Sequence, residues 1–120
     1  MDIIEIDNLR LRCIIGFSPH ERKDRQDVII SLRLGCDSRR AGISDNPDDA
    51  FNYRTVTKAI IEHVEASEYF LVEKLAAEIA HICVVDYGAP YAQVRVHKPG
   101  ALRFSDSVGI VIERTPDDYV

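Results

Sequence analysis

The order of two hydrophobic periodicities along the chain most limits what it can fold into. Apolar residues alternate with polar ones in four segments and recur at helical spacing in two, in the order alternating, alternating, helical, helical, alternating, alternating. The segments are residues 4–15, 28–34, 53–65, 71–85, 91–97 and 108–112. Alternation is typical of strands with one buried face, and recurrence at three and four residues of amphipathic helices. The order predicts an α+β fold with a four-stranded antiparallel sheet and two helices on one of its faces.

Several local breaks refine these boundaries. The alternation in the first strand slips once at Asp7-Asn8, which predicts a bulge or bend. The polar stretch 17–25 is expected to connect the first two strands as a long hairpin. Lys98-Pro99-Gly100 is expected to break the third strand, because proline cannot donate to the ladder. The acidic tail, residues 116–120, is expected to fray. Three carboxylates are available to cap the first helix: Asp45, Asp48 and Asp49.

Glu73 falls in the first turn of the second helix, whose apolar stripe is Leu71, Leu75, Ile79 and Ile82. The unpaired N–H groups and the helix dipole favour an ionised carboxylate at this position. Such an acceptor, fixed by a packed helix, can receive two donors from the edge of a flat ligand. The alternative is that Glu73 only stabilises the start of the helix.

Composition limits the function classes. The 120 residues suit one domain, residues 1–120, with 46% hydrophobic and 29% charged residues. A net charge of −5 gives no electrostatic support for a nucleic-acid or anionic-membrane partner. No apolar run approaches the ~20 residues that span a bilayer, and the acidic N-terminus does not resemble a secretory signal. We therefore expect a cytoplasmic protein.

Cysteine and histidine usage argues against a disulfide framework and a metal site. Cys13, Cys36 and Cys83 are odd in number and lie in apolar runs, as reduced core thiols do. The four histidines have no spacing typical of metal ligands. We therefore expect no metal.

A four-stranded sheet covered on one side leaves two open edges, and open edges tend to pair. Closing a barrel with further copies of the chain would bury them. The topology therefore predicts a homo-oligomer.

A series of residues spread from Ile3 to Arg114 resembles the dihydroneopterin aldolase family, which includes dihydroneopterin triphosphate 2′-epimerases. No single element is a strong motif, and the resemblance lies in the order and spacing of the whole series. Its members are Ile15-Gly16, Glu21, Gln26, Asn52-Tyr53, Leu71-Val72-Glu73, Lys98-Pro99-Gly100 and Val108-Gly109. The resemblance implies the ββααββ tunnelling fold, in which tetrameric rings form one barrel, often stacked to octamers, with active sites between subunits.

The resemblance also implies which residues bind the substrate. Glu73 matches the residue that grips the 2-amino and N3 side of the pterin, and backbone groups around Val72 complete the ring contacts. Gln26 is expected to support the neighbouring loop. Phe51 and Asn52, contributed by the adjacent subunit, are expected beside the ring. Taken singly, each of these residues also fits an ordinary surface or packing role.

The catalytic residues that the resemblance implies are Lys98, Glu21 and Tyr53. The family reaction cleaves 7,8-dihydroneopterin by a retro-aldol step to 6-hydroxymethyl-7,8-dihydropterin and glycolaldehyde. The substrate's own N5=C6 imine takes up the electrons of the broken C1′–C2′ bond, so no cofactor is implied. Lys98 would promote proton transfer through its charge and an ordered water, Glu21 would lie near the side chain, and Tyr53 of the adjacent subunit would protonate the enol.

Several alternatives remain open. The segments 52–58 and 101–108 look more like the epimerase branch, whereas 98–100 and 108–114 look more like the aldolase branch, which we favour because Lys98 is next to the chemistry. An epimerase acting on a triphosphate needs cations, which Arg54, Lys58 and Arg103 would supply unless they are solvated surface charges or form interface ion pairs. A non-catalytic pterin-binding ring would not need Tyr53 and Lys98. Another tunnelling-fold enzyme, GTP cyclohydrolase I, requires zinc, for which this chain lacks a Cys/His cluster.

Overall fold

Four antiparallel strands form one sheet in the order in which they follow one another along the chain. A computed structural model describes all residues, 1–120. The strands are β1 (Asp2–Cys13), β2 (Gln26–Cys36), β3 (Ala92–Pro99) and β4 (Ser107–Arg114). The outer edges of β1 and β4 therefore pair with no other strand of the chain. This arrangement confirms the predicted sheet.

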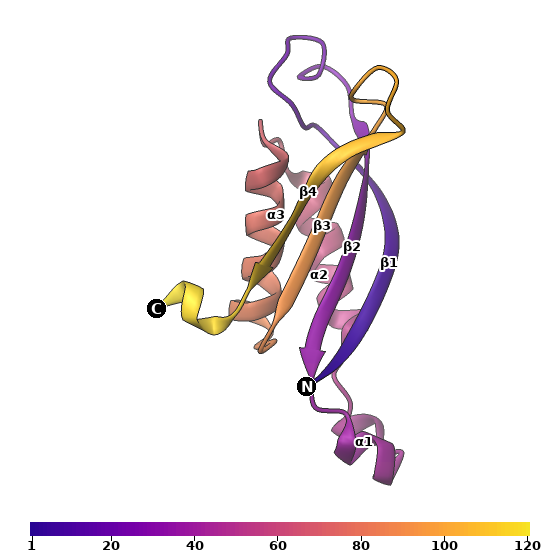
Figure 1. Ribbon diagram of the computed structural model, residues 1–120, viewed down its shortest axis with the longest axis vertical. Coiled ribbons are helices and arrows are strands. Elements are labelled where there is room, and N and C mark those ends of the chain that lie inside the picture. The colour runs from indigo at the N-terminus through magenta and orange to yellow at the C-terminus, as the bar shows by residue number, and fades with distance from the viewer.

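Two helices, α2 (Tyr53–Ala66) and α3 (Val72–His81), pack on the same face of this sheet (Figure 1). The chain continues from α3 into a π-helical turn, Ile82–Asp86, so the helix predicted at 71–85 is present as α3 and this turn together. Three short helices complete the chain: α1 (Arg39–Ser44), η1 (Pro47–Asp49) and η3 (Pro116–Tyr119). The ββααββ order is confirmed.

The core lies between the sheet and the two helices, as the periodicities require. Every second residue of β2 and β3 is buried, and so is the inner stripe of each helix. The central members are Val28, Ile30, Leu32, Leu34, Val56, Ile60, Val64, Leu75, Ile79, Val94 and Val96. Fully burying one such aliphatic side chain contributes about 1.5–3 kcal/mol relative to leaving it exposed. Mutual burial of these faces therefore holds the helices on the sheet.

The three cysteines are free and buried, as expected. Burial disfavours the thiolate and raises the pKa of Cys83 to about 12. These thiols stay protonated at neutral pH and behave as apolar packing groups.

The predicted bulge in β1 is confirmed. The register of β1 against β2 shifts between Ile6 and Leu9. Asn8 adopts a φ of 57° and donates its N–H to Ser31 Oγ at 3.0 Å. The bulge returns the apolar residues of β1 to the helix-covered face after the slip.

The third strand does not break at Lys98, because β3 continues through Pro99. Pairing with β2 ends at His97, whereas pairing with β4 extends to Pro99 and Ser107. Gly100 donates its N–H to Asp106 across the turn to β4. The nitrogen of Pro99 therefore faces the opposite side, where β2 no longer pairs, and its missing proton removes no ladder bond.

Two further expectations are wrong. The tail does not fray: Thr115 and Asp118 form a capping box that starts η3, and Tyr119 meets the His81 ring edge-on at 5.4 Å between centroids. The cap of α2 is not one of the aspartates. Asn52 accepts the N–H of Thr55 at 3.2 Å.

The two ends of the elongated molecule carry different loops (Figure 1). The β1–β2 connection, the β3–β4 turn and the start of α3 gather at one end. The start of α2 lies toward the other end, near α1. No helix has both the length and the apolar character needed to cross a membrane.

Candidate functional site

A cleft of about 440 Å³ opens at the end where α3 begins. We call it the Lys98 cleft. The β1–β2 connection, the start of α3 with the segment before it, and the strands β3 and β4 with their turn supply its walls, so residues far apart in sequence meet there. They are Gly16, Phe17, Glu21, Phe70, Leu71, Val72, Glu73, Lys98, Ala101, Val108, Gly109 and Ile110. The cleft unites the predicted residues Glu21, Val72, Glu73 and Lys98.

Lys98 belongs to the alternating set of β3 that faces the helices, after Ala92, Val94 and Val96. It is the one buried charged side chain of the protein, with 9% of the residue exposed. Its Nζ donates to Glu21 Oε2 at 2.5 Å. A cation so largely removed from water needs such a partner, because unpaired burial of a charge is costly. The strand thereby holds an ammonium group at the wall of the cleft.

Glu21 is fixed from several directions. Besides Lys98, its carboxylate accepts hydrogen bonds from Ser18 Oγ at 2.7 Å and from Gln26 Nε2 at 3.3 Å. These donors, Lys98 first among them, stabilise the charged form and lower the pKa of Glu21 from 4.5 to about 2. The Glu21 carboxylate is therefore ionised near neutral pH, and in the cleft it pairs with the Lys98 ammonium.

Gln26 begins β2 and supports the loop rather than lining the cleft. Its Nε2 also donates to the carbonyl oxygen of Ile15 at 2.6 Å, so one amide joins both ends of the β1–β2 connection. This contact agrees with the supporting role expected for Gln26. Direct contact of Gln26 with a substrate stays a prediction.

Glu73 and Val72 line the same cleft from the first turn of α3. Leu71 precedes the helix in an extended conformation and provides no side-chain cap. The first-turn N–H groups consequently lack the usual capping acceptor. A carboxylate beside free backbone donors suits a planar heterocycle that carries both N–H donors and a carbonyl acceptor along one edge.

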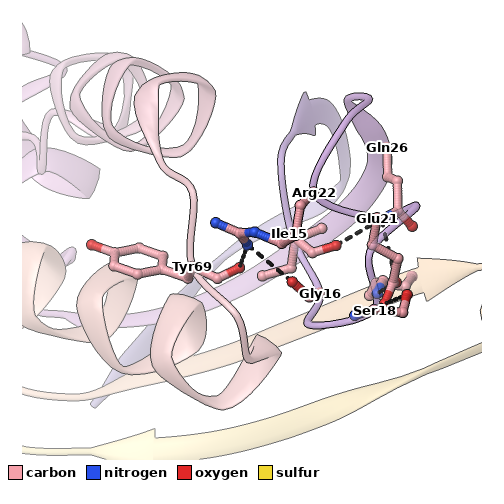
Figure 2. A network of polar contacts seen from close by, with 8 residues as sticks. Ile15, Gly16, Ser18, Glu21, Arg22, Gln26 and Tyr69 are labelled. Carbon is pink, nitrogen blue, oxygen red and sulfur yellow. Dashed lines mark hydrogen bonds and ion pairs between the residues drawn. The ribbon is translucent and has the colours of Figure 1, made fainter.

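Arg22 is a residue that the sequence did not single out. Its guanidinium reaches from the β1–β2 connection to the segment before α3 and donates to the carbonyl oxygens of Gly16 and Tyr69, at 2.9 and 3.1 Å (Figure 2). It lies among other charged loop residues, and its acceptors are backbone atoms. No residue pattern could therefore have distinguished it.

The start of α2 forms a second cleft, of about 620 Å³, which we call the Tyr53 cleft. It lies between α2 and the edge strand β1 and is lined by Ile4, Glu5, Ile6, Tyr53, Arg54, Thr57, Lys58 and Ile61. Tyr53 is half-exposed there. The neighbouring Asn52 caps α2, and Phe51 packs against the core. Within one chain, the structure does not bring these residues to the Lys98 cleft.

The three residues proposed to bind phosphate also lie at two different places in the chain's structure. Arg54 and Lys58, one helical turn apart, line the Tyr53 cleft and form no ion pair. Arg103 lies in the β3–β4 turn, and its guanidinium is 5.1 Å from the centre of the Phe104 ring. That turn also supplies Ala101 to the Lys98 cleft. Phosphate contacts by these residues stay a prediction.

Gly109 of β4 lets two strands approach closely beside the Lys98 cleft. A Cβ atom at this position would overlap the carbonyl oxygen of Val96 and the backbone of His97 on β3. Any larger residue would have to displace β4, which carries the cleft residues Val108 and Ile110.

The geometry allows a specific kind of chemistry. A buried ammonium paired with an ionised carboxylate can order a water and move protons on a ligand bound in the same cleft. The structure contains no cluster of three or more His, Cys, Asp or Glu side chains that could hold a metal ion.

Comparison with known proteins shows which family the chain belongs to. The model of the family described as FolB, dihydroneopterin aldolase, matches residues 4–113. The chain is 42% identical over 110 residues to dihydroneopterin triphosphate 2′-epimerase of Escherichia coli, covering 92% of both chains. It is 31% identical over 114 residues to dihydroneopterin aldolase of the same organism, covering 95% of this chain and 93% of that one. The crystal structure of E. coli dihydroneopterin aldolase in complex with neopterin superposes with a TM-score of 0.91 at 31% identity, over 95% of this chain and 99% of that one. The chain belongs to the dihydroneopterin aldolase family.

Proposed function

We propose that this protein cleaves the C1′–C2′ bond of 7,8-dihydroneopterin by a retro-aldol reaction and releases 6-hydroxymethyl-7,8-dihydropterin and glycolaldehyde. One observation carries the proposal: the buried Lys98, its partner Glu21 and Glu73 at the uncapped start of α3 line one cleft. The match to the aldolase family and the neopterin complex of a relative support it.

Each group has a role in this proposal. Glu73 accepts hydrogen bonds from the ring's 2-amino and N3–H groups, while free N–H groups near Val72 donate to the ring oxygen. Lys98 acts through its charge and a bound water on N5 and the 2′-oxygen, and Glu21 holds the Lys98 ammonium in place. The imine N5=C6 of the substrate accepts the electrons, so the reaction uses no cofactor. Positioned acid–base catalysis of this kind contributes about 10²–10⁴-fold.

We further propose that the chain works as a cytoplasmic homo-oligomer in which Tyr53 of one subunit completes the Lys98 cleft of the next. The open edges of β1 and β4, and the position of Tyr53 in a separate cleft, support this arrangement. Phe51 and Asn52 would approach the ring from the same neighbour. Tyr53 would protonate the enol carbon, C1′, after cleavage.

Mixed oligomers test the shared site. We expect the Lys98→Ala and Tyr53→Phe variants to be nearly inactive alone. Co-expressed in equal amounts, they would regain about a quarter of wild-type activity, because half of the Lys98 sites are intact and half of those face an intact Tyr53. Mixed oligomers with no regained activity would exclude a site built from two subunits.

Epimerisation at C2′ of the triphosphate is the second candidate. The 42% identity to an epimerase, compared with 31% to an aldolase, favours it. Arg54 and Lys58, which have no carboxylate partners, would bind the triphosphate. Cleavage of the triphosphate substrate leaves the triphosphate on the two-carbon aldehyde, and re-addition of this glycolaldehyde triphosphate to the opposite face before release would give the 2′-epimer from the same site.

Incubation with each substrate separately distinguishes the two. Chromatography of the products from 7,8-dihydroneopterin and from its triphosphate would show hydroxymethyldihydropterin for the aldolase and the 2′-epimer for the epimerase. If neither substrate were converted while neopterin still bound, the protein would be a pterin-binding ring without catalysis.

A further inference from the structure

Arg22 connects two segments that are far apart in sequence. Its Nη1 donates to Gly16 O at 2.9 Å and Tyr69 O at 3.1 Å, and its Nη2 donates to Glu68 O at 2.7 Å. Its guanidinium also lies over the ring of Phe70, 4.2 Å from the centroid. One side chain thus binds the β1–β2 connection and the segment that leads into α3 (Figure 2).

Few other bonds hold these segments together. The Gly16 N–H donates to the carbonyl oxygen of Tyr69 at 3.2 Å, and no other backbone hydrogen bond joins the loop to residues 68–71. The planar fork of an arginine can satisfy several carbonyl oxygens at fixed angles, which the point charge of a lysine cannot do. Arg22 therefore supplies most of the connection.

The two connected segments form two walls of the Lys98 cleft. Gly16, Phe17 and Glu21 form one of them and residues 70–73 form another, while β3, β4 and the turn between them complete the lining. Glu21, which holds Lys98, is the immediate neighbour of Arg22. A change in the position of Arg22 would therefore move the catalytic wall relative to the wall that contains Glu73.

We propose that Arg22 is a positioning residue that sets the separation of the Glu21–Lys98 pair from the ring-binding start of α3. The proposal rests on the proposed function of the cleft. It assigns to Arg22 no contact with the substrate. Without Arg22, Glu73 would still bind the pterin ring, but the Glu21–Lys98 pair would no longer be held beside the side chain of the substrate, where the reaction takes place.

Arg25 provides a matched control. It lies in the same connection, and its Nη1 likewise donates to two backbone carbonyl oxygens, of Arg12 at 3.2 Å and of Glu65 at 2.9 Å. None of these residues lines the Lys98 cleft. Arg25→Ala therefore removes a comparable connection between the loop and the helical layer without touching either wall.

The experiment compares Arg22→Ala, Arg22→Lys and Arg25→Ala with the wild type. For each, kcat and KM for 7,8-dihydroneopterin are measured, with kcat expressed per neopterin-binding site so that unfolded protein is not counted. Because misplacing reacting groups by about 1 Å can cost 10²-fold, we expect Arg22→Ala to lower per-site kcat by roughly 10- to 100-fold while KM changes less. Arg22→Lys should recover part of the loss, and Arg25→Ala should stay within about threefold of wild type.

Hydrogen exchange gives a second readout that needs no turnover. In Arg22→Ala, residues 16–25 and 68–73 should lose protection together, whereas Arg25→Ala should leave 68–73 unchanged. The proposal is overturned if per-site kcat is unaffected in Arg22→Ala, if both alanine variants lose it equally, or if 68–73 stay protected. A wild-type protein that converted neither 7,8-dihydroneopterin nor its triphosphate would refute the proposed function instead. Hydrogen exchange and the neopterin affinity of the variants would then still decide whether Arg22 joins the two walls.

Discussion

Lys98 and Glu21, 77 residues apart in the chain, meet through an Nζ–Oε2 hydrogen bond of 2.5 Å. The side chains are only 11% and 18% exposed. This pair is the point at which the sheet and the β1–β2 connection converge on the cleft. It combines a charge suited to proton transfer with the partner that allows that charge to be buried.

Replacing Lys98 by alanine should abolish turnover and spare binding. The variant keeps Glu73 and the start of α3 but loses the group that orders water and promotes proton transfer. We expect kcat to fall by about 10²–10⁴-fold, with the neopterin dissociation constant changed by less than about tenfold. Wild-type-like turnover would remove Lys98 from the mechanism.

The Glu21–Lys98 pair should also make the stability of the folded protein depend on pH. The folded-state pKa of Glu21 is about 2, below its ordinary 4.5, chiefly because of the bond from Lys98. Its contribution to stability is therefore complete above pH 4.5 and is lost as the pH falls from there toward 2. The unfolding temperature of the wild type should drop more steeply across that window than that of Glu21→Gln. Parallel curves for the two proteins would contradict this. Asp37 also has a pKa of about 2. Because it is present in both proteins, its contribution cancels when the wild type is compared with Glu21→Gln.

Glu73→Gln should weaken pterin binding. The substitution exchanges an ionic acceptor for a neutral amide that presents donors to donors, and hydrogen bonds to charged groups are worth about 1.5–3 kcal/mol. We expect the neopterin dissociation constant, measured by calorimetry, to rise by roughly 10- to 100-fold.

Glu78→Gln is the control on the same helix. It removes the ion pair with Lys74, at 2.7 Å, outside the cleft. Its neopterin affinity should match the wild type. An unchanged affinity in Glu73→Gln as well would show that Glu73 only stabilises the start of α3.

Gly109→Ala should destabilise the fold. The added methyl group has no space beside Val96, so β4 must shift, and overpacking of this kind costs about 1–3 kcal/mol. Gly42→Ala is the matched control, because Gly42 lies in the exposed helix α1 with nothing within 4 Å of the new atom. The control should be neutral or stabilising by up to about 1 kcal/mol. Denaturant unfolding gives the stability of both variants. Equal stability of Gly109→Ala and Gly42→Ala would contradict the close approach of β3 and β4 at Gly109.

The architecture could be predicted because each main element has its own periodicity. The alternating residues of β2 and β3, and most of the predicted stripes of α2 and α3, are buried. Leu71 is the exception in the predicted α3 stripe, because it precedes the helix in an extended conformation and is exposed. The six-residue helix α1 was missed because it buries no residue and so leaves no apolar pattern. A capping box and the contact of Tyr119 with His81 hold η3 in place. The acidic composition of the tail gives no sign of either interaction.

The site was predicted by resemblance rather than by pattern. Glu73 alone is distinguished by its place at a helix start, whereas Glu21 lies in a run of charges and Lys98 looks like an ordinary strand lysine. Their pairing depends on how a loop folds over the end of a strand, which no local spacing encodes. The bonds from Arg22 to backbone oxygens are hidden for the same reason.

The position of the Tyr53 cleft, apart from the Lys98 cleft, has a consequence for how activity depends on amount. Under the proposed assembly, each chain carries halves of two different centres and no complete one. Specific activity should then decline on dilution below the dissociation constant of the oligomer and recover on concentration. A newly synthesised chain would be inactive until it assembled with other subunits.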